Sequence, residues 1–265
     1  MNNDLIKVFI EKVKDESLYK KFLEKEIIYQ LIDIFKGDYN KISYPNRIKN
    51  PLEISLQFYK NYNEEYYKMI MDGIQNDKIE IIQGEGKSFV NTNTNTTHIR
   101  LYGNDSDIFI IVHELAHYID KNSCPQIISD DYWFLSETFA FYMEKKLEKW
   151  LEYKKYEELI SIRRNNRLYY ESKMLKAIEI ELYYEELYKD KGTIEENDID
   201  FEKIKLVQNY NESNLVNYLL QYPLANILST HLIEKNIKDN DFINTCLTAN
   251  LYEIIKNIPK RIVKI

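Results

Sequence analysis

Residues that interrupt helices are scarce in this chain. Only 6 glycines and 5 prolines occur among its 265 residues. Because glycine and proline are the residues that most disfavour a helix interior, a chain so poor in them is expected to form long helices. The hydrophobic content of 44% and the charged content of 30% are typical of a soluble globular protein with a packed core. We therefore predict a mainly helical fold.

Apolar residues recur at intervals of three and four along most of the chain, which is the pattern of a helix with one buried face. The pattern is present at residues 4–36 and 52–76, and the segment 38–51 between them contains two prolines and is expected to be a loop. From about residue 131 the chain is nearly all helical in pattern. The helices expected there lie near residues 136–151, 153–190, 200–209, 213–236 and 240–257.

A short β region interrupts the helical pattern after residue 77. The segments KIEIIQ (78–83), SFV (88–90) and HIRLY (98–102) are expected to form strands, and the polar run before the last of them an extended loop or sheet edge. The segment GNDSD (103–107) then supplies turn residues and an N-cap for the next helix. We expect a single domain of residues 1–265, with a helical part at 1–77 and a second part at 78–265 that begins with this small sheet.

Charge and cysteine content exclude several classes of protein. The net charge is −7, with 43 acidic and 36 basic residues, which argues against nucleic-acid binding. The pair Arg163–Arg164 is interpreted as part of a solvated helical face. No uninterrupted apolar stretch has the length of a signal peptide or membrane span. The only cysteines, Cys124 and Cys246, imply no disulfide framework, so a cytoplasmic location and no membrane partner are expected.

The segment IFIIVHELAHYID (108–120) carries the most specific chemical pattern in the chain. Residues four apart share one helix face, so His113 and His117 can direct their imidazoles at one metal ion. Zinc favours such nitrogen ligands and keeps one position open for water in catalytic sites. Glu114 follows the first ligand directly and can act as a general base toward that water. Two ordinary helix histidines are the alternative interpretation.

A third ligand is expected from the next helix. In SETFAFYMEKKL (136–147), Glu137 precedes an apolar run and is the best candidate for that ligand. A favourable interaction with the helix N-terminus is the alternative explanation for a glutamate at this position.

Two further acidic residues are candidates to orient a ligand histidine by hydrogen bonding. Glu144 shares a helix face with Glu137, and Asp120 shares one with His113 and His117. The alternative for both is a solvated surface acid. Neither remaining histidine has the spacing of a ligand, and His98 is expected to be a surface residue.

The same residues resemble a known family, the zinc oligopeptidases of the thimet oligopeptidase and oligoendopeptidase F type, a branch of the glutamate-liganded zinc peptidases. The resemblance has three parts: THIRLYGNDSDIFIIVHELAHYID (97–120), SETFAFYMEKKL (136–147) and NYLLQYPLANILSTHL (217–232). They are similar to the strand, turn and His-Glu-x-x-His helix of that family, to its third-ligand helix and to its late tyrosine-bearing helix. The chain is much shorter than typical members.

This resemblance implies a zincin-like catalytic part at residues 78–265 and a peptide substrate. It implies one Zn²⁺ per chain, bound by His113, His117 and Glu137, with Glu114 as the base. By the same resemblance, Tyr218 and Tyr222 would donate a hydrogen bond to the oxyanion of the tetrahedral intermediate, although packing is the alternative for both. The strand that begins at His98 is expected to pair with an extended peptide by strand addition.

Two other functions are consistent with the sequence. HELAHYI (113–119) is also similar to short intracellular proteases that cleave phage-type repressors, which act on one protein partner. The chain could also be a non-catalytic helical interaction protein, or could carry a structural zinc. The presence of Glu114 argues against a structural zinc, because such a site has no use for a base. The sequence predicts no oligomeric state.

Overall fold

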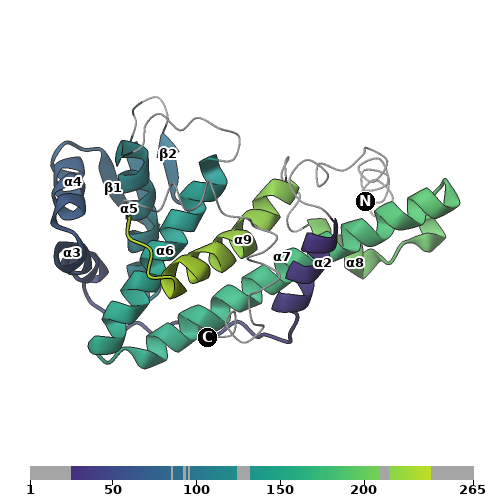
Figure 1. Cartoon of the computed structure of the whole chain (residues 1–265), viewed down its shortest axis with the longest axis horizontal. Helices are drawn as coiled ribbons and strands as arrows, with labels where there is room; N and C mark the ends of the chain where they lie inside the picture. Colours follow the sequence, from purple (N-terminus) through teal and green to yellow (C-terminus); the bar gives the residue numbers. More distant parts are fainter. Residues whose placement is uncertain are drawn as a thin grey trace. The chain divides into compact units, whose positions relative to one another are not determined.

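The structure is a computed structural model that describes residues 25–84, 86–91, 94, 96–123, 132–208 and 215–239. This part of the chain is mainly helical with one small sheet, which confirms the prediction of a mainly helical fold (Figure 1). None of the described helices has the length and apolar character of a membrane span. The helices are α2 (Lys25–Phe35), α3 (Pro51–Tyr62), α4 (Glu64–Gln75), α5 (Asp107–Ser123), α6 (Tyr132–Tyr153), α7 (Glu157–Lys191), the 3₁₀ turn η2 (Glu196–Asp198), α8 (Phe201–Gln208) and α9 (Leu215–Glu234).

The chain divides into two compact units. Unit 1 consists of Met1–Asn40, Arg167–Leu224 and Asn250–Ile265, and unit 2 consists of Lys41–Asn166 and Ala225–Ala249. Residue 77, where the sequence suggests a boundary within the single expected domain, falls inside unit 2. The reason is that α3 and α4 do not form a body of their own, because both pack against α5.

The sheet belongs to unit 2 and has three strands, β1 (Ile79–Gln83), β2 (Phe89–Asn91) and β3 (Thr96–Leu101). Their order is β1-β3-β2, with β1 parallel and β2 antiparallel to the central strand β3. All three strands lie where the sequence predicts them. β3 begins two residues early, because Thr96 and Thr97 of the polar run pair with β2.

One helix expected from the sequence is two helices in the structure. The apolar pattern at 52–76 continues across Asn63, but α3 ends there and α4 begins directly after it. Asn63 is extended, with φ −154° and ψ 113°, and its side-chain oxygen accepts hydrogen bonds from the backbone N–H groups of Glu65 and Tyr66. An asparagine that bonds to the backbone in this way caps a new helix and interrupts the previous one.

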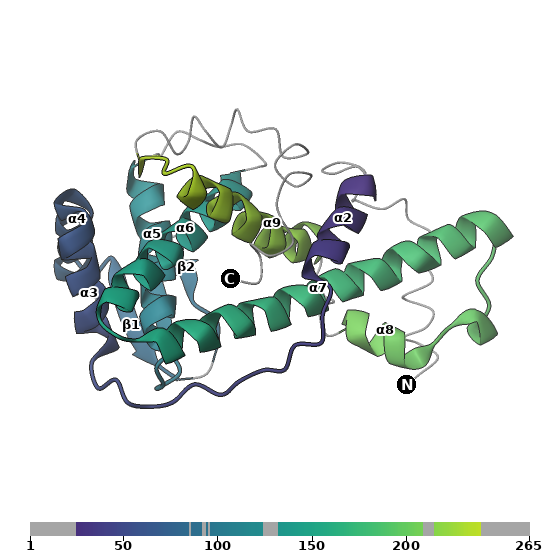
Figure 2. The same cartoon turned by 60° about the horizontal axis from the view of Figure 1, so that its bottom comes forward.

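Helix α5 is the centre of unit 2. It packs against α3, α4, α6 and β3, and α5 and α6 lie side by side in both views (Figures 1 and 2). Its contacts with α3 include a hydrogen bond of 2.8 Å from the Tyr59 hydroxyl to the Val112 carbonyl oxygen. Its fully buried apolar residues are Ile108, Phe109, Ile111, Val112, Leu115 and Ala116. With its neighbours packed around it on several sides, α5 is a rigid support for any polar side chain that it carries.

The turn between β3 and α5 is held by carboxylates, as the segment GNDSD predicts. Asp107, the first residue of α5, accepts hydrogen bonds of 2.8 Å from the backbone N–H groups of Tyr102 and Gly103. Gly103 has φ +75°, a left-handed conformation that favours glycine. Asp105 accepts backbone hydrogen bonds from Arg47 and Ile48, which anchors the long loop before α3 to the start of α5.

Unit 1 contains α2, the later part of α7, α8 and the first part of α9. In Figure 2, α8 turns back alongside α7, and the backbone N–H of Asp200 donates a 2.8 Å hydrogen bond to the Tyr184 hydroxyl between them. Lys25 and Tyr29 of α2 both contact Glu186 of α7. Of the helix expected at 4–36, only the last part lies in the described residues, and the helix expected near 240–257 lies outside them.

Candidate metal centre

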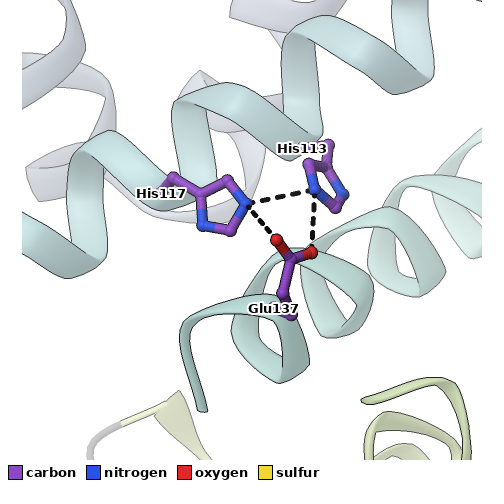
Figure 3. Close-up of side chains that lie close together, drawn as sticks. All are labelled: His113, His117 and Glu137. Atoms are coloured by element: carbon purple, nitrogen blue, oxygen red, sulfur yellow. Dashed lines mark hydrogen bonds and ion pairs between the residues drawn. The ribbon is translucent and has the colours of Figure 1, made fainter. Parts of the chain in front are cut away.

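Two histidines of α5 converge on one glutamate of α6. His113 and His117 are one helical turn apart, so their side chains leave α5 on the same side, where α6 packs (Figure 3). Glu137 approaches them from α6 (Figure 3). The three side chains are 14%, 19% and 12% exposed, respectively. The cluster is therefore largely enclosed by unit 2, yet open enough for a small molecule to reach it.

The nitrogen and oxygen atoms of this cluster lie at similar distances from one another. The Nε2 atoms of His113 and His117 are 3.1 Å apart. His113 Nε2 lies 3.3 Å from Glu137 Oε2, and His117 Nε2 lies 3.5 Å from Glu137 Oε1. Atoms bound tetrahedrally to a zinc ion at about 2.0–2.1 Å lie about 3.3 Å from one another. The three distances, two of which end on different oxygens of Glu137, are close to that value, so these residues fit a zinc ion.

The outer nitrogen of each imidazole also has a partner. His113 Nδ1 is 2.7 Å from Oε1 of Glu144, and His117 Nδ1 is 2.8 Å from Oγ of Ser136. A carboxylate only accepts hydrogen bonds, so the proton of a neutral His113 lies on Nδ1 and the lone pair of Nε2 points into the cluster. Partners of this kind orient the histidine ligands of metal ions.

Glu144 is completely buried, and Arg163 of α7 accounts for that. Arg163 Nε and Nη2 donate hydrogen bonds of 2.8 and 2.6 Å to Oε2 of Glu144. The interpretation of Arg163 as part of a solvated face is therefore wrong, and so is the alternative of a solvated Glu144. The spacing of α7 alone contains no signal of this contact, because the partner lies 19 residues earlier on another helix.

The position of Glu137 within α6 excludes the alternative explanation for it. Helix α6 begins at Tyr132, five residues before Glu137, rather than near residue 136. The favourable interaction of a carboxylate with a helix N-terminus declines after the first turn. Ser136, which the sequence analysis did not select, contacts His117 from the same turn of α6. The only local signal for it is its place next to Glu137 before an apolar run.

The histidines and carboxylates of the cluster shift one another's pKa values. Burial alone would lower the pKa of His113, but the carboxylates of Glu137 and Glu144 outweigh it and raise that pKa to about 10. Burial would raise the pKa of Glu137, but the positive charge of His117 and the bonds to both histidines hold it far below its usual range. Without a metal ion, the cluster therefore holds a proton on His113 that a cation would have to displace.

Glu114, the expected base, follows His113 on α5 and is half-buried. Its carboxylate makes no hydrogen bond or ion pair with any residue that the structure describes. It therefore has both oxygens available to a water molecule or a substrate.

The structure leaves the roles of three other candidates as predictions. Asp120 is half-buried one turn after His117. Tyr222 is half-buried in α9, and the side chain of Tyr218 lies outside the described residues; both tyrosines belong to unit 1. His231, in the last turn of α9, is not part of the cluster.

One of two expectations about β3 is wrong. The side chain of His98 is 15% exposed, because the ring of Phe89 stacks on it at 4.4 Å and Glu80 lies 2.7 Å from its Nδ1, so His98 is not a surface residue. At His98 itself, β3 is already aligned with Glu80 of β1 on one side and Phe89 of β2 on the other. The register with β2 ends at His98, so strand addition along the rest of β3 stays a prediction. The sequence marks β3 as a strand but contains no signal for its central place in the sheet.

Comparison with solved structures supports a distant structural relationship to oligoendopeptidases. A crystal structure described as a "putative oligoendopeptidase F" from Bacillus anthracis superposes with a TM-score of 0.56 at 13% sequence identity. The match covers 98% of this chain and 54% of that chain, so this chain spans about half the length of its structural relative. No protein-family model and no curated protein sequence matches the chain. The likeness at this identity concerns the fold, which is that of a helical, oligoendopeptidase-like protein.

Proposed function

We propose that this chain is a zinc-dependent metallopeptidase that hydrolyses oligopeptides or unfolded segments of proteins. The observation that carries the proposal is the convergence of His113 Nε2, His117 Nε2 and the carboxylate of Glu137. The two nitrogens are 3.1 Å apart and lie 3.3 and 3.5 Å from one carboxylate oxygen each, which is close to the spacing of zinc ligands. The outer nitrogens of both histidines are held by Glu144 and Ser136, so the metal-facing atoms are oriented in advance.

Each candidate residue would have a separate role in peptide hydrolysis. His113, His117 and Glu137 would hold the zinc ion. The bound ion would lower the pKa of a water molecule and polarise the scissile carbonyl. Glu114 would accept the proton of the attacking water and return it to the leaving amine, because it directly follows the ligand His113 on α5 and its carboxylate has no partner among the described residues. Tyr218 and Tyr222 remain candidates for hydrogen bonding to the developing oxyanion.

A catalytic site is favoured over a structural one by the number of ligands. Structural zinc sites are closed by four protein ligands, whereas catalytic sites use three and leave one position for water or substrate. Within the described residues, His113, His117 and Glu137 form a group of three. The half-buried Glu114 beside that group is further support, since a structural ion requires no base.

The fold also supports a peptidase. The structural relative is described as a "putative oligoendopeptidase F", and this chain covers about half of it. A peptide rather than another acyl substrate is proposed on that likeness.

Metal analysis followed by peptide cleavage tests the proposal. Mass spectrometry of the purified wild type should find about one zinc per chain. Glu137→Ala should lose that zinc, and Glu152→Ala, an exposed glutamate on the same helix, should keep it. Glu114→Gln should retain zinc but not cleave a mixture of unrelated short peptides. A folded wild type without metal, or cleavage by Glu114→Gln at the wild-type rate, would exclude the proposed mechanism.

A further inference from the structure

Three helices of unit 2 contribute to a hydrogen-bonded chain that ends at the metal centre. It runs from Arg163 of α7 through Glu144 of α6 to His113 of α5. Oε1 of Glu144 accepts from His113 Nδ1, and Oε2 accepts from two N–H groups of Arg163. The central carboxylate is 0% exposed, so water cannot replace either partner.

The guanidinium group of Arg163 is itself fixed on two sides. One side is the pair of hydrogen bonds to Glu144, and the other is the ring of Phe109, whose centroid lies 5.4 Å from the guanidinium carbon. Phe109 is fully buried in α5 one turn before His113. An arginine placed in this way is a rigid, planar donor whose two N–H groups determine where the accepting carboxylate lies.

The geometry points to Arg163 as a positioning residue of the metal centre, which fixes the carboxylate of Glu144 so that His113 presents Nε2 to the metal. A free glutamate side chain has several rotamers, and Glu144 adopts one that places Oε1 2.7 Å from His113 Nδ1. The two bonds from Arg163 hold Oε2 and thereby select that rotamer. This inference rests on the proposed function, because it concerns the ligand set that the function requires.

The neighbouring residue supplies a matched control. Arg164 lies next to Arg163 on α7 and donates a 2.8 Å hydrogen bond from Nε to Glu148, a glutamate one turn after Glu144 on α6. Glu148 is 3% exposed, so this is also an arginine paired with a buried glutamate. The described contacts of Arg164 are with Glu148 and Glu152 and not with Glu144. Loss of either arginine removes a similar pair, but only Arg163 reaches His113 through its partner.

The experiment compares wild type, R163Q, R163K and R164Q. Zinc affinity is measured by competition with a chromophoric chelator, cobalt coordination by the visible absorption spectrum of the Co²⁺-loaded protein, and folding by thermal unfolding. We expect R163Q to bind zinc roughly 10–100-fold more weakly than wild type and to show an altered cobalt spectrum. R164Q should match wild type in zinc affinity and cobalt spectrum, even if its melting temperature falls as much as that of R163Q. R163K, which retains the charge but not the planar fork, should lie between R163Q and wild type.

The outcomes separate this inference from the proposed function. Wild type that takes up no metal would overturn both. Wild type that binds zinc while R163Q and R164Q bind it equally well, or equally badly, would overturn only the role of Arg163. If R163Q does not fold, R163K decides alone, and a wild-type zinc affinity with a wild-type cobalt spectrum in R163K would refute the positioning role.

Discussion

The Nε2 atoms of His113 and His117 lie 3.1 Å apart, with their outer nitrogens bonded to Glu144 and Ser136. If both imidazoles are neutral with protons on Nδ1, two lone pairs face each other at this distance, beside the carboxylate of Glu137. Such an arrangement is unfavourable unless a proton or a cation lies between the three groups. The competition between proton and cation for this position determines how the site responds to pH and to substitution.

Zinc affinity should increase as the pH is raised from about 6 toward about 9, because zinc binding requires that His113 release its proton. In the metal-free protein, the carboxylates of Glu137 and Glu144 raise the pKa of His113 to about 10, so the proton is present over this range. The measurement is the zinc dissociation constant at a series of pH values, with proton release followed in two buffers of different ionisation enthalpy. An affinity that does not change with pH would contradict this account.

The stability of the metal-free protein should depend on the same proton. The pKa of His113 is about 10 in the folded state and about 6.5 in the unfolded chain, so its contribution to stability is complete below about pH 6.5. That contribution is lost as the pH rises toward about 10. Lysines and tyrosines also titrate near there, so the informative quantity is the difference in unfolding free energy between wild type and His113→Gln. This difference should shrink with rising pH, and a constant difference would refute the prediction.

Ser136→Ala should weaken zinc binding by roughly tenfold with little loss of stability, because His117 Nδ1 would lose its 2.8 Å partner. The substitution removes one half-buried hydroxyl, which costs about 1 kcal/mol of unfolding free energy. Ser172→Ala is the matched control, since the hydroxyl of Ser172 bonds only to the Tyr169 carbonyl of its own helix among the described residues. The zinc affinities of both variants are measured by competition with a chelator. Equal affinities would show that Ser136 does not orient His117.

Glu144→Ala should be the most destabilising of these substitutions. It removes a fully buried carboxylate and leaves the guanidinium of Arg163 without its charged partner, which costs about 3–5 kcal/mol when a buried pair is broken. Glu152→Ala, which breaks an exposed pair with Arg164 at 3.3 Å, should cost about 0–1 kcal/mol. Denaturant unfolding of the two variants provides the comparison. A loss of less than about 1 kcal/mol in Glu144→Ala would mean that the buried pair contributes little.

Much of the local structure was predictable because it depends on neighbours in the sequence. The apolar periodicity marks most helices within a few residues, and the alternating segments mark all three strands. The errors have identifiable causes. Asn63 divides one predicted helix into two because its side chain caps α4. His98 is covered because β2 pairs with β3 and places the ring of Phe89 against it. Such strand pairing depends on contacts that the periodicity of one segment does not contain.

The sequence by itself determined that His113 and His117 share one face of a helix, with Glu114 beside them, because the period of 3.6 residues per turn is a property of the backbone. The tertiary structure decided which residues meet that face. Glu137, Glu144 and Ser136 reach it because α6 packs along α5, and Arg163 reaches Glu144 because α7 passes close to α6 there. Packing between helices depends on the shape and burial of side chains distant in sequence, so the spacing along one helix predicts the ligands on that helix but not their partners.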